Sequence, residues 1–451
     1  MRLALPALED WNKLMGRPAS TAKWRRARDW TLLSLGGVVV AVFMLGFDAG
    51  EKAATEIRAF LFGLSPWVFL LITPITFGVI RYLTLRYAPF AGGSGIPQVL
   101  GVIRSTRRTR DYAGNFLLSP LKSLFKGVAV VTAMAAGGTV GREGPAIQIG
   151  ASLMSAWCAR WVPRMRVSPR MIVTAGAATG LAAAFSTPVA AVLYAFEDLS
   201  AGRKLRSHGF LLLPILVSFL CVWALGHHVP FFALEQVGET WPPLWAGIGV
   251  TVLCGLVAGV MGWAMVIGLP RLLPVTRTPL EGAFLAAAIG LVLAIFGIWT
   301  AGLSMGSGND TSAALLNAAG EFDQTTSVGL IKTLSMTLTF ASGIPAGILT
   351  PSLAAGAGFG NDFAVFFALE THRQALVAIG MAAFMSGVIR APVTCAVLIA
   401  ELTGLYGLLT HFLVAALLGT GAASLIMRES LYEVLFKRLL DPLANIKIEQ
   451  T

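Results

Sequence analysis

Two stretches of the chain decide its fold: residues 135–151 read AAGGTVGREGPAIQIGA, and residues 341–357 read ASGIPAGILTPSLAAGA. Each stretch interrupts a hydrophobic segment with glycine and proline. The matched landmarks, each pair 206 residues apart, are Gly137 and Gly343, Gly141 and Gly347, Pro145 and Pro351, and Gly150 and Gly356. The first stretch also carries a carboxylate, Glu143. A carboxylate in a broken apolar segment, in a frame that is duplicated, is typical of an ion transporter with internal repeats.

A second pair of stretches extends the repeat. Residues 188–197 read PVAAVLYAFE and residues 392–401 read PVTCAVLIAE, at an offset of 204 residues. Glu197 and Glu401 end the two stretches, and their equivalence favours a helix-end role over proton transfer. The expected organisation is, in chain order, a cytoplasmic amphipathic segment 1–29, a first transmembrane repeat 30–226, a connection 227–242, a second repeat 243–440 that ends in a pore-reaching helix, and a cytoplasmic tail 441–451.

The composition excludes an ordinary soluble protein. Hydrophobic residues make up 56% of the 451 positions and charged residues only 13%, whereas soluble domains carry about 25% charged residues. Several apolar runs reach the roughly 20 residues that a membrane-spanning helix needs. Runs broken by glycine and proline are tolerated at membrane depth only where they are buried or line a cavity. We therefore expect an all-α, multi-pass membrane protein in the lipid bilayer.

The net charge of +11 is not spread in a way that predicts nucleic-acid binding. Arg25, Arg26 and Arg28 precede the first apolar run, and Lys437 and Arg438 follow the last one. Because cytoplasmic loops carry the excess of lysine and arginine, both termini are expected in the cytoplasm.

The four cysteines and five histidines occur singly and without ligand spacing. This pattern predicts neither a disulfide framework nor a metal site, so we expect no cofactor. Only about 20 residues follow the last apolar run, and they resemble no additional soluble domain.

A third glycine-rich break reads GGSGIP at residues 92–97. In each of the three breaks proline suits the first turn of a helix, so each break is expected to start a helix at membrane depth. The first turn of such a helix presents unpaired N–H groups and about half a positive charge, which attracts anions. One helix end cannot offset the cost of dehydrating an anion, so the three breaks together predict a shared anion site.

The segments GSGIP at 93–97, GREGP at 141–145 and GILTP at 347–351 resemble the three signature motifs of the CLC family of chloride channels and chloride/proton antiporters. The resemblance covers about residues 30–440. It implies two inverted-topology repeats with broken and re-entrant helices, in a homodimer with one anion pathway per subunit. It also indicates a bacterial-type inner-membrane protein whose substrates are chloride and protons.

The resemblance further implies roles for individual residues. The hydroxyls of Ser94 and Tyr432 and the backbone around Gly95, Ile348 and Leu349 would bind the anion. Glu143 would be a gate that occupies an anion site when ionised and leaves it when protonated.

The resemblance also suggests roles for charged residues elsewhere in the matched region. Asp198 stands where antiporters of the family have an inward-facing, proton-passing glutamate, with Glu197 beside it. Lys126 would add positive potential near the pathway or else extend to the interface. Arg142 would attract anions or face water at the outer vestibule.

The chain departs from the family pattern at three positions. Leu349 replaces the usual aromatic residue of the third motif, Asp198 replaces glutamate, and Gln98 stands where an acidic residue often follows the first motif. The changes at Asp198 and Gln98 affect the expected proton coupling rather than anion conduction. Ser94 favours chloride over nitrate or fluoride, because family members selective for those ions typically change this residue.

The sequence leaves three alternatives to a chloride/proton antiporter. The first is a passive, voltage-independent chloride channel. The second is an intramembrane hydrolase using the Glu197/Asp198 pair or Ser304, which lies in a Gly-x-Ser-x-Gly pattern at residues 302–306. The third is a cation/proton exchanger using Glu143 and Asp198. We favour the antiporter, which is not an enzyme.

Overall fold

The computed structural model describes residues 19–104, 117–159, 165, 167–200, 209–225, 231–232, 234, 241–317 and 327–445. In these ranges regular structure is helical, apart from two isolated β-bridges. The first half contains α2 (Ala19–Leu64), η1 (Pro66–Val68), α3 (Phe69–Tyr87), α4 (Ile96–Arg104), α6 (Pro120–Ala135), α7 (Glu143–Ala159), α8 (Pro169–Phe185), α9 (Pro188–Tyr194), η3 (Ala195–Leu199) and α10 (Gly209–Ala224). The second half contains α11 (Leu244–Trp263), η4 (Ala264–Gly268), α12 (Leu269–Leu272), α13 (Pro279–Trp299), α14 (Asn309–Leu316), α15 (Val328–Ala341), α16 (Leu349–Phe366), η5 (Glu370–His372), α17 (Arg373–Ile389), α18 (Pro392–Thr403), η6 (Tyr406–Leu408), α19 (Leu409–Ile426) and α20 (Leu431–Asn445).

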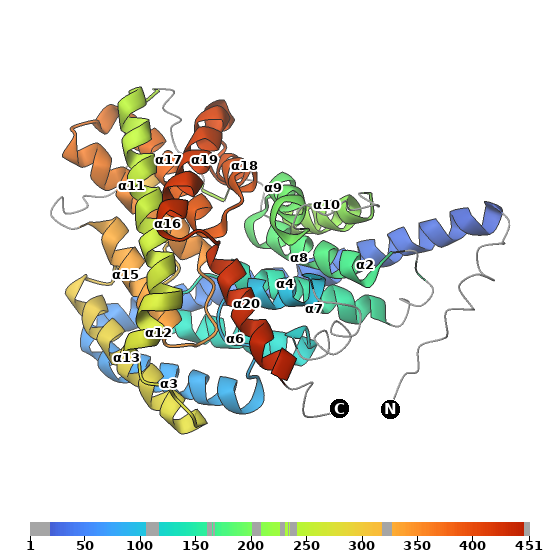
Figure 1. Ribbon diagram of the computed structural model, residues 1–451, viewed down its shortest axis with the longest axis horizontal. Helices are drawn as coiled ribbons and strands as arrows, with labels where there is room; N and C mark the ends of the chain where they lie inside the picture. Colours follow the sequence, from blue (N-terminus) through green and yellow to red (C-terminus); the bar gives the residue numbers. More distant parts are fainter. Residues whose placement is uncertain are drawn as a thin grey trace.

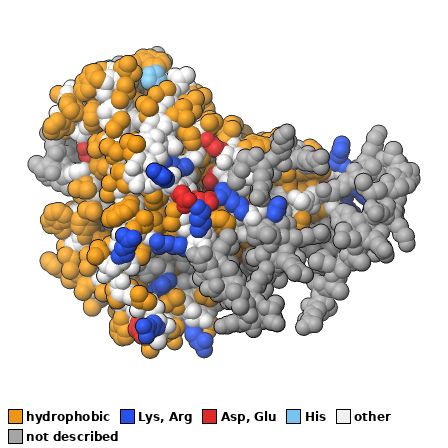
Figure 2. All heavy atoms as spheres, in the orientation of Figure 1, with side chains coloured by type: hydrophobic (Ala, Val, Ile, Leu, Met, Phe, Trp, Pro, Cys, Tyr) orange, Lys and Arg blue, Asp and Glu red, His pale blue; other side chains and the backbone are white. Residues whose placement is uncertain are grey.

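Six helical segments in the described ranges are long and apolar enough to cross a bilayer. Their outer faces are hydrophobic: on α3, for example, Leu71, Ile75 and Val79 are 69, 62 and 52% exposed at a spacing of four residues. Figure 2 shows apolar side chains spread over most of the visible described surface. Soluble monomers rarely expose contiguous apolar patches of this extent. The exposed rows therefore face lipid, and the predicted all-α, polytopic fold is confirmed.

The N-terminal boundary expected at residue 29 falls inside a helix. Residues 19–64 form one helix of 46 residues, which is about 69 Å long at 1.5 Å per residue and so exceeds the ~30 Å hydrocarbon core. Its charged residues Asp48 and Glu51 belong to the same helix as the first apolar run. Residues 1–18 and most of the predicted connection 227–242 lie outside the described residues. At the other end α20 continues past residue 440 to Asn445, and residues 446–451 are not described.

The two halves repeat the same order of elements. Helices α7, α8 and α9 begin 206, 204 and 204 residues before α16, α17 and α18, as the first residues of each pair give 349−143, 373−169 and 392−188. Figure 1 shows that the halves also interleave, because α3 of the first half lies beside α13 of the second, and the two are in contact. The duplication seen in the sequence is therefore a duplication of structure.

Equivalent residues of the halves contact each other reciprocally. The carboxylate of Glu197 accepts hydrogen bonds from the backbone N–H groups of Val393 (3.1 Å) and Thr394 (2.7 Å) at the start of α18. Glu401 accepts the corresponding bonds from Val189 (3.1 Å) and Ala190 at the start of α9. Each glutamate thus satisfies N–H groups that a helix start leaves unpaired. Reciprocal contacts between equivalent residues are those of a two-fold relation.

Matched glycines let consecutive helices pack backbone to backbone. Gly150 of α7 meets Gly176 of α8, and Gly356 of α16 meets Gly380 of α17. A Cβ at any of these four positions would press against the carbonyl oxygen of the facing glycine. Small residues at helix interfaces are what permit such close approach in membranes.

Substituting Gly150 with alanine should therefore destabilise the protein. The added Cβ would stand 2.9 Å from Gly180 Cα and still closer to the Gly176 carbonyl, and overpacking of this kind costs about 1–3 kcal/mol. The matched control is Gly46→Ala on α2, where nothing lies within 4 Å of the added atom. Thermal unfolding in detergent should show a lower midpoint for Gly150→Ala only. Equal midpoints for the two variants would contradict this packing.

Candidate functional site

The three glycine-rich breaks meet in space. Gly93 of the first break donates to the carbonyl of Ile344 (3.1 Å) and accepts from the N–H of Ala346 (3.2 Å). Gly141 of the second break pairs with Gly347 of the third through two backbone bonds of 2.8 and 3.1 Å, as an antiparallel bridge. The helices that follow these breaks are α4, α7 and α16, as the sequence predicts. Their first turns are consequently held within one region.

The conformation of the first break requires glycine. Gly93 and Gly95 have φ angles of +68° and +110°, where a side chain would be strained. Space requires it too, because a Cβ on Gly95 would stand 2.8 Å from the carbonyl of Gly144. Between the two glycines lies Ser94, which is 1% exposed and whose hydroxyl has no hydrogen-bond partner in the described protein. The break thus places a buried hydroxyl beside the start of α7.

Helix α20 brings Tyr432 to the same region. Its ring is completely buried, and its hydroxyl makes no hydrogen bond in the described chain. The Ser94 hydroxyl is its near neighbour, and the carboxylates of Glu143 and Asp198 lie within electrostatic reach. In Figure 1, α20 crosses the front of the molecule, and it packs against α4. Buried hydroxyls are normally hydrogen-bonded, so two unpaired ones side by side indicate a binding region for an acceptor.

The third break contributes backbone only. Ile348 caps α16 and Leu349 is its first residue, and both side chains are 1% exposed. The N–H groups of such positions have no partner within their own helix. The aliphatic Leu349 keeps this N–H, so the departure from an aromatic residue does not remove a donor.

Glu143 is the first residue of α7 and is completely buried. Neither of its carboxylate oxygens makes a hydrogen bond within the described residues. Its Oε2 atom and the hydroxyl of Thr350 stand 2.7 and 3.1 Å from the point where a Cβ on Gly141 would lie. The side chain therefore reaches across the bridge to the first turn of α16, a position that favours a negative group.

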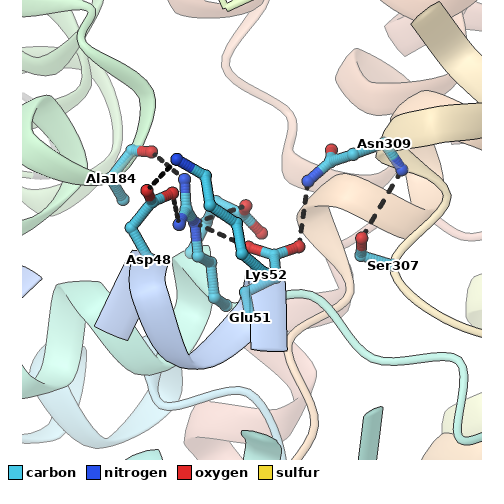
Figure 3. Close-up of polar contacts among 8 residues, drawn as sticks. Asp48, Glu51, Lys52, Ala184, Ser307 and Asn309 are labelled. Carbon is cyan, nitrogen blue, oxygen red and sulfur yellow. Dashed lines mark hydrogen bonds and ion pairs between the residues drawn. The ribbon is translucent and has the colours of Figure 1, made fainter. Parts of the chain in front are cut away.

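Arg142 lies in the wall of a cavity, where acidic partners hold it and little of its side chain is exposed. Its side chain is only 5% exposed and forms ion pairs with Asp48 and with Glu51, whose Oε2 lies 3.0 Å from Nε. It also donates to the carbonyl of Ala184 at 2.9 Å. Figure 3 shows Asp48, Glu51 and Lys52 on one stretch of helix, with Ala184 on one side and Asn309 on the other. Two carboxylates offset the positive potential that Arg142 was expected to supply.

Lys126 is completely buried on α6, so it does not extend to the membrane interface. Its ammonium donates to Oε1 of Gln148 at 2.6 Å. That oxygen stands 2.9 Å from where a Cβ on Gly95 would lie. One side chain therefore separates a buried lysine from the first break.

A second polar cluster lies around Asp198, on the π-helical segment η3. Asp198 is partly exposed, and its backbone carbonyl accepts a bond from Arg104 at 3.0 Å. Arg104, at the end of α4, also forms an ion pair with Glu433 of α20. Tyr194 lies within electrostatic reach of both Asp198 and Tyr432. The candidate proton residue is thus connected to the helix that carries Tyr432.

Sequence reasoning missed Arg104, Glu433, Asp48 and Glu51 as site residues. Arg104 and Glu433 are 329 residues apart, and Arg142 is 94 residues from Asp48. A usable signal was present for Asp48 and Glu51, which are two acidic residues at i, i+3 in an apolar helix, since charges in such helices usually have partners.

The hydrolase pattern around Ser304 has no catalytic surroundings. Ser304 is buried, and its hydroxyl interacts with that of Thr300 at 3.1 Å. Within the described ranges no hydrogen bond joins it to histidine or to a carboxylate. Glu197, the other alternative, uses both carboxylate oxygens at the start of α18.

Three solved structures share this fold. A slow cyanobacterial Cl⁻/H⁺ antiporter matches with a TM-score of 0.75 and 23% identity, covering 92% of this chain and 98% of that one. A eukaryotic CLC transporter matches at 0.71 and 22%, covering 91% and 74%. A CLC-type fluoride/proton antiporter matches at 0.70 and 22%, covering 90% and 97%.

A family model described as voltage gated chloride channel matches residues 76–424, which is more than half of the chain and includes all three breaks. The described helices, the converging breaks and this match agree. The chain therefore belongs to the voltage-gated chloride channel (CLC) family.

Proposed function

We propose that this protein is a chloride/proton antiporter in which Glu143 is both gate and proton carrier. The observation that carries the proposal is the position of the Glu143 carboxylate, buried without a hydrogen bond against the first turn of α16. A carboxylate there resembles a bound anion. It would compete with chloride for the same helix start when ionised and release it when protonated.

Chloride would be bound by groups that suit an anion lacking its hydration shell. The donors are the hydroxyls of Ser94 and Tyr432 and the N–H groups near Gly95, Ile348 and Leu349. Each hydrogen bond to a charged group contributes about 1.5–3 kcal/mol, whereas dehydrating an ion costs several kcal/mol even in a relaxed protein. Several donors are needed, and the buried amine of Lys126 lies one side chain away from the first break, where it donates to Gln148.

Proton movement to the opposite side would use Asp198. Its Oδ2 is buried without a hydrogen bond, and Tyr194 and the chloride donor Tyr432 both lie within electrostatic reach of this carboxylate. Two of the matched structures are described as proton antiporters, which supports coupling. Glu197 remains a weaker candidate, because its oxygens hold the start of α18.

We infer a homodimer with one pathway per subunit, in the inner membrane with both termini cytoplasmic. Basic residues at the start of α2 and on α20 support this orientation.

Reconstitution in liposomes tests the function directly. The liposomes have a chloride gradient, and potassium and valinomycin clamp the voltage at zero. Downhill chloride movement should then drive protons in the opposite direction, against the proton gradient that builds up. Chloride flux alone would indicate a passive channel. In a separate assay without chloride or valinomycin, proton movement driven by a sodium or potassium gradient would indicate a cation exchanger.

Glu143→Gln should abolish uphill proton movement while chloride flux continues. The amide has the shape of a protonated carboxyl and cannot carry a proton, so it neither blocks the site by charge nor couples. Glu370→Gln, an exposed change on η5, is the control. Proton pumping that survives in Glu143→Gln would remove this residue from the coupling mechanism.

Ser94→Ala and Tyr432→Phe should each weaken chloride binding about 10- to 100-fold, the equivalent of one hydrogen bond to an ion. Both changes delete a hydroxyl and leave the remaining packing intact. Isothermal titration calorimetry in detergent measures the affinity, with Tyr406→Phe, an exposed site, as the control. An unchanged affinity in both variants would place the anion elsewhere.

Asp198→Asn should abolish proton transport and leave chloride flux, since the amide keeps the shape but does not titrate. Asp198→Glu should retain coupling, because it restores a carboxylate with the reach that is usual in the family. Simultaneous recording of both fluxes separates the two results. Full coupling in Asp198→Asn would exclude a relay role and direct attention to Glu197.

A further inference from the structure

The residue next to the gate has an unusual charge environment. Arg142 Nε lies 3.9 Å from Oε1 of Glu143. The same nitrogen lies 3.0 Å from Oε2 of Glu51, and another guanidinium nitrogen pairs with Asp48. Arg142 is therefore shared between the gate and two other carboxylates.

The charges of the four residues Arg142, Lys52, Asp48 and Glu51 cancel when Glu143 is not ionised. Arg142 and Lys52 contribute +2, and Asp48 and Glu51 contribute −2, where Lys52 pairs with Asp48 at 2.9 Å. An ionised Glu143 consequently meets a cation whose charge is already balanced. With Asp48 or Glu51 neutral, Arg142 would have an unbalanced positive charge beside the gate.

The position of Arg142 is fixed by elements outside the gate. Asp48 and Glu51 come from α2, and Ala184 near the end of α8 accepts a further bond at 2.9 Å. Glu51 is itself held by Asn309 of α14, which donates to its other oxygen at 3.0 Å. Arg142 is thus clamped, and Glu51 is the carboxylate of this clamp whose charge lies beside the same Nε that approaches Glu143.

These carboxylates are accessible from solvent. A cavity of about 430 Å³ is lined by Asp48, Glu51, Lys52 and Arg142 and also by Glu56 and Asp310. Both last-named residues are exposed. The lining has four acidic and two basic side chains, so the cavity is net negative and does not concentrate anions by charge.

We propose that Asp48 and Glu51 are positioning residues which clamp and neutralise Arg142 and thereby set the pH at which the Glu143 gate closes the pathway. The proposal rests on the proposed role of Glu143 as the gate. The groups that face Glu143 are Glu51 from α2, the adjacent Arg142, Thr350 from α16 and Tyr432 from α20.

The direction of the effect follows from the sign of each charge. Removing the charge of Glu51 leaves Arg142 free to stabilise ionised Glu143, so the gate stays ionised to lower pH. Removing the charge of Arg142 has the opposite effect. The pH of half-maximal chloride flux should therefore fall in Glu51→Gln and rise in Arg142→Gln.

The test measures chloride flux from liposomes between pH 4 and pH 8, with equal pH on both sides and the voltage clamped at zero. Glu51→Gln should lower the midpoint by at least about one pH unit, a tenfold change in proton concentration. Glu51→Asp keeps the charge, so its midpoint should lie closer to that of the native protein than the midpoint of Glu51→Gln does. Glu56→Gln is the matched control, because it removes the same charge from the same helix and cavity without contacting Arg142.

Two further variants separate this inference from the proposed function. Glu143→Gln should remove the pH dependence, and Glu51→Gln added to it should then shift nothing. A pH dependence that persists in Glu143→Gln would overturn the proposed gate itself. Loss of the pH dependence in Glu143→Gln, as expected, leaves the gate in place. The positioning role is then overturned if Glu51→Gln lowers chloride flux equally at all pH values. It is also overturned if Glu51→Gln shifts the pH of half-maximal flux no more than Glu56→Gln does.

Discussion

Two backbone hydrogen bonds between Gly141 and Gly347 join the halves of the protein at the position where each half starts a helix. Because these residues are equivalent in the repeat, one antiparallel contact places the starts of α7 and α16 face to face. Glycine is needed at both positions, since a Cβ on Gly347 would press into the carbonyl of Gly141. The proposed anion site, the reach of Glu143 to α16 and the close approach of Ser94 all lie around this contact.

Duplication also explains a buried charge that the proposed pathway does not use. Lys332 is equivalent to Lys126, as 332−126 gives the repeat offset of 206, and both side chains are completely buried. Lys126 donates to Gln148 beside the first break, whereas Lys332 donates to the carbonyl of Met305 at 2.9 Å. A buried ammonium is costly unless it is paired, so each half has supplied its own acceptor. The lysine at this repeat position contacts a residue beside the first break in one half and a backbone carbonyl in the other half.

Local sequence rules predicted the three helix starts, because glycine and proline act through the residues next to them. They also predicted that Glu197 and Glu401 are equivalent. They could not predict which charges meet, since the partners of Arg142 and Arg104 lie 94 and 329 residues away. Nor could they predict that residue 29 lies inside a helix: α2 begins at Ala19 and continues to Leu64, through Asp48 and Glu51, the partners of Arg142.

The backbone contacts between the halves limit how the proposed gate, Glu143, can move. The starts of α7 and α16 are joined through backbone bonds, and the starts of α9 and α18 are held by the glutamates of the opposite half. A rigid movement of one half against the other would break these bonds together, and each buried group left unpaired costs about 1–3 kcal/mol. The Glu143 side chain, by contrast, has no hydrogen bond to lose. If Glu143 is the gate, as proposed, its opening would therefore be a rotation of this side chain within a fixed backbone, governed by the charge on Arg142 rather than by helix movement.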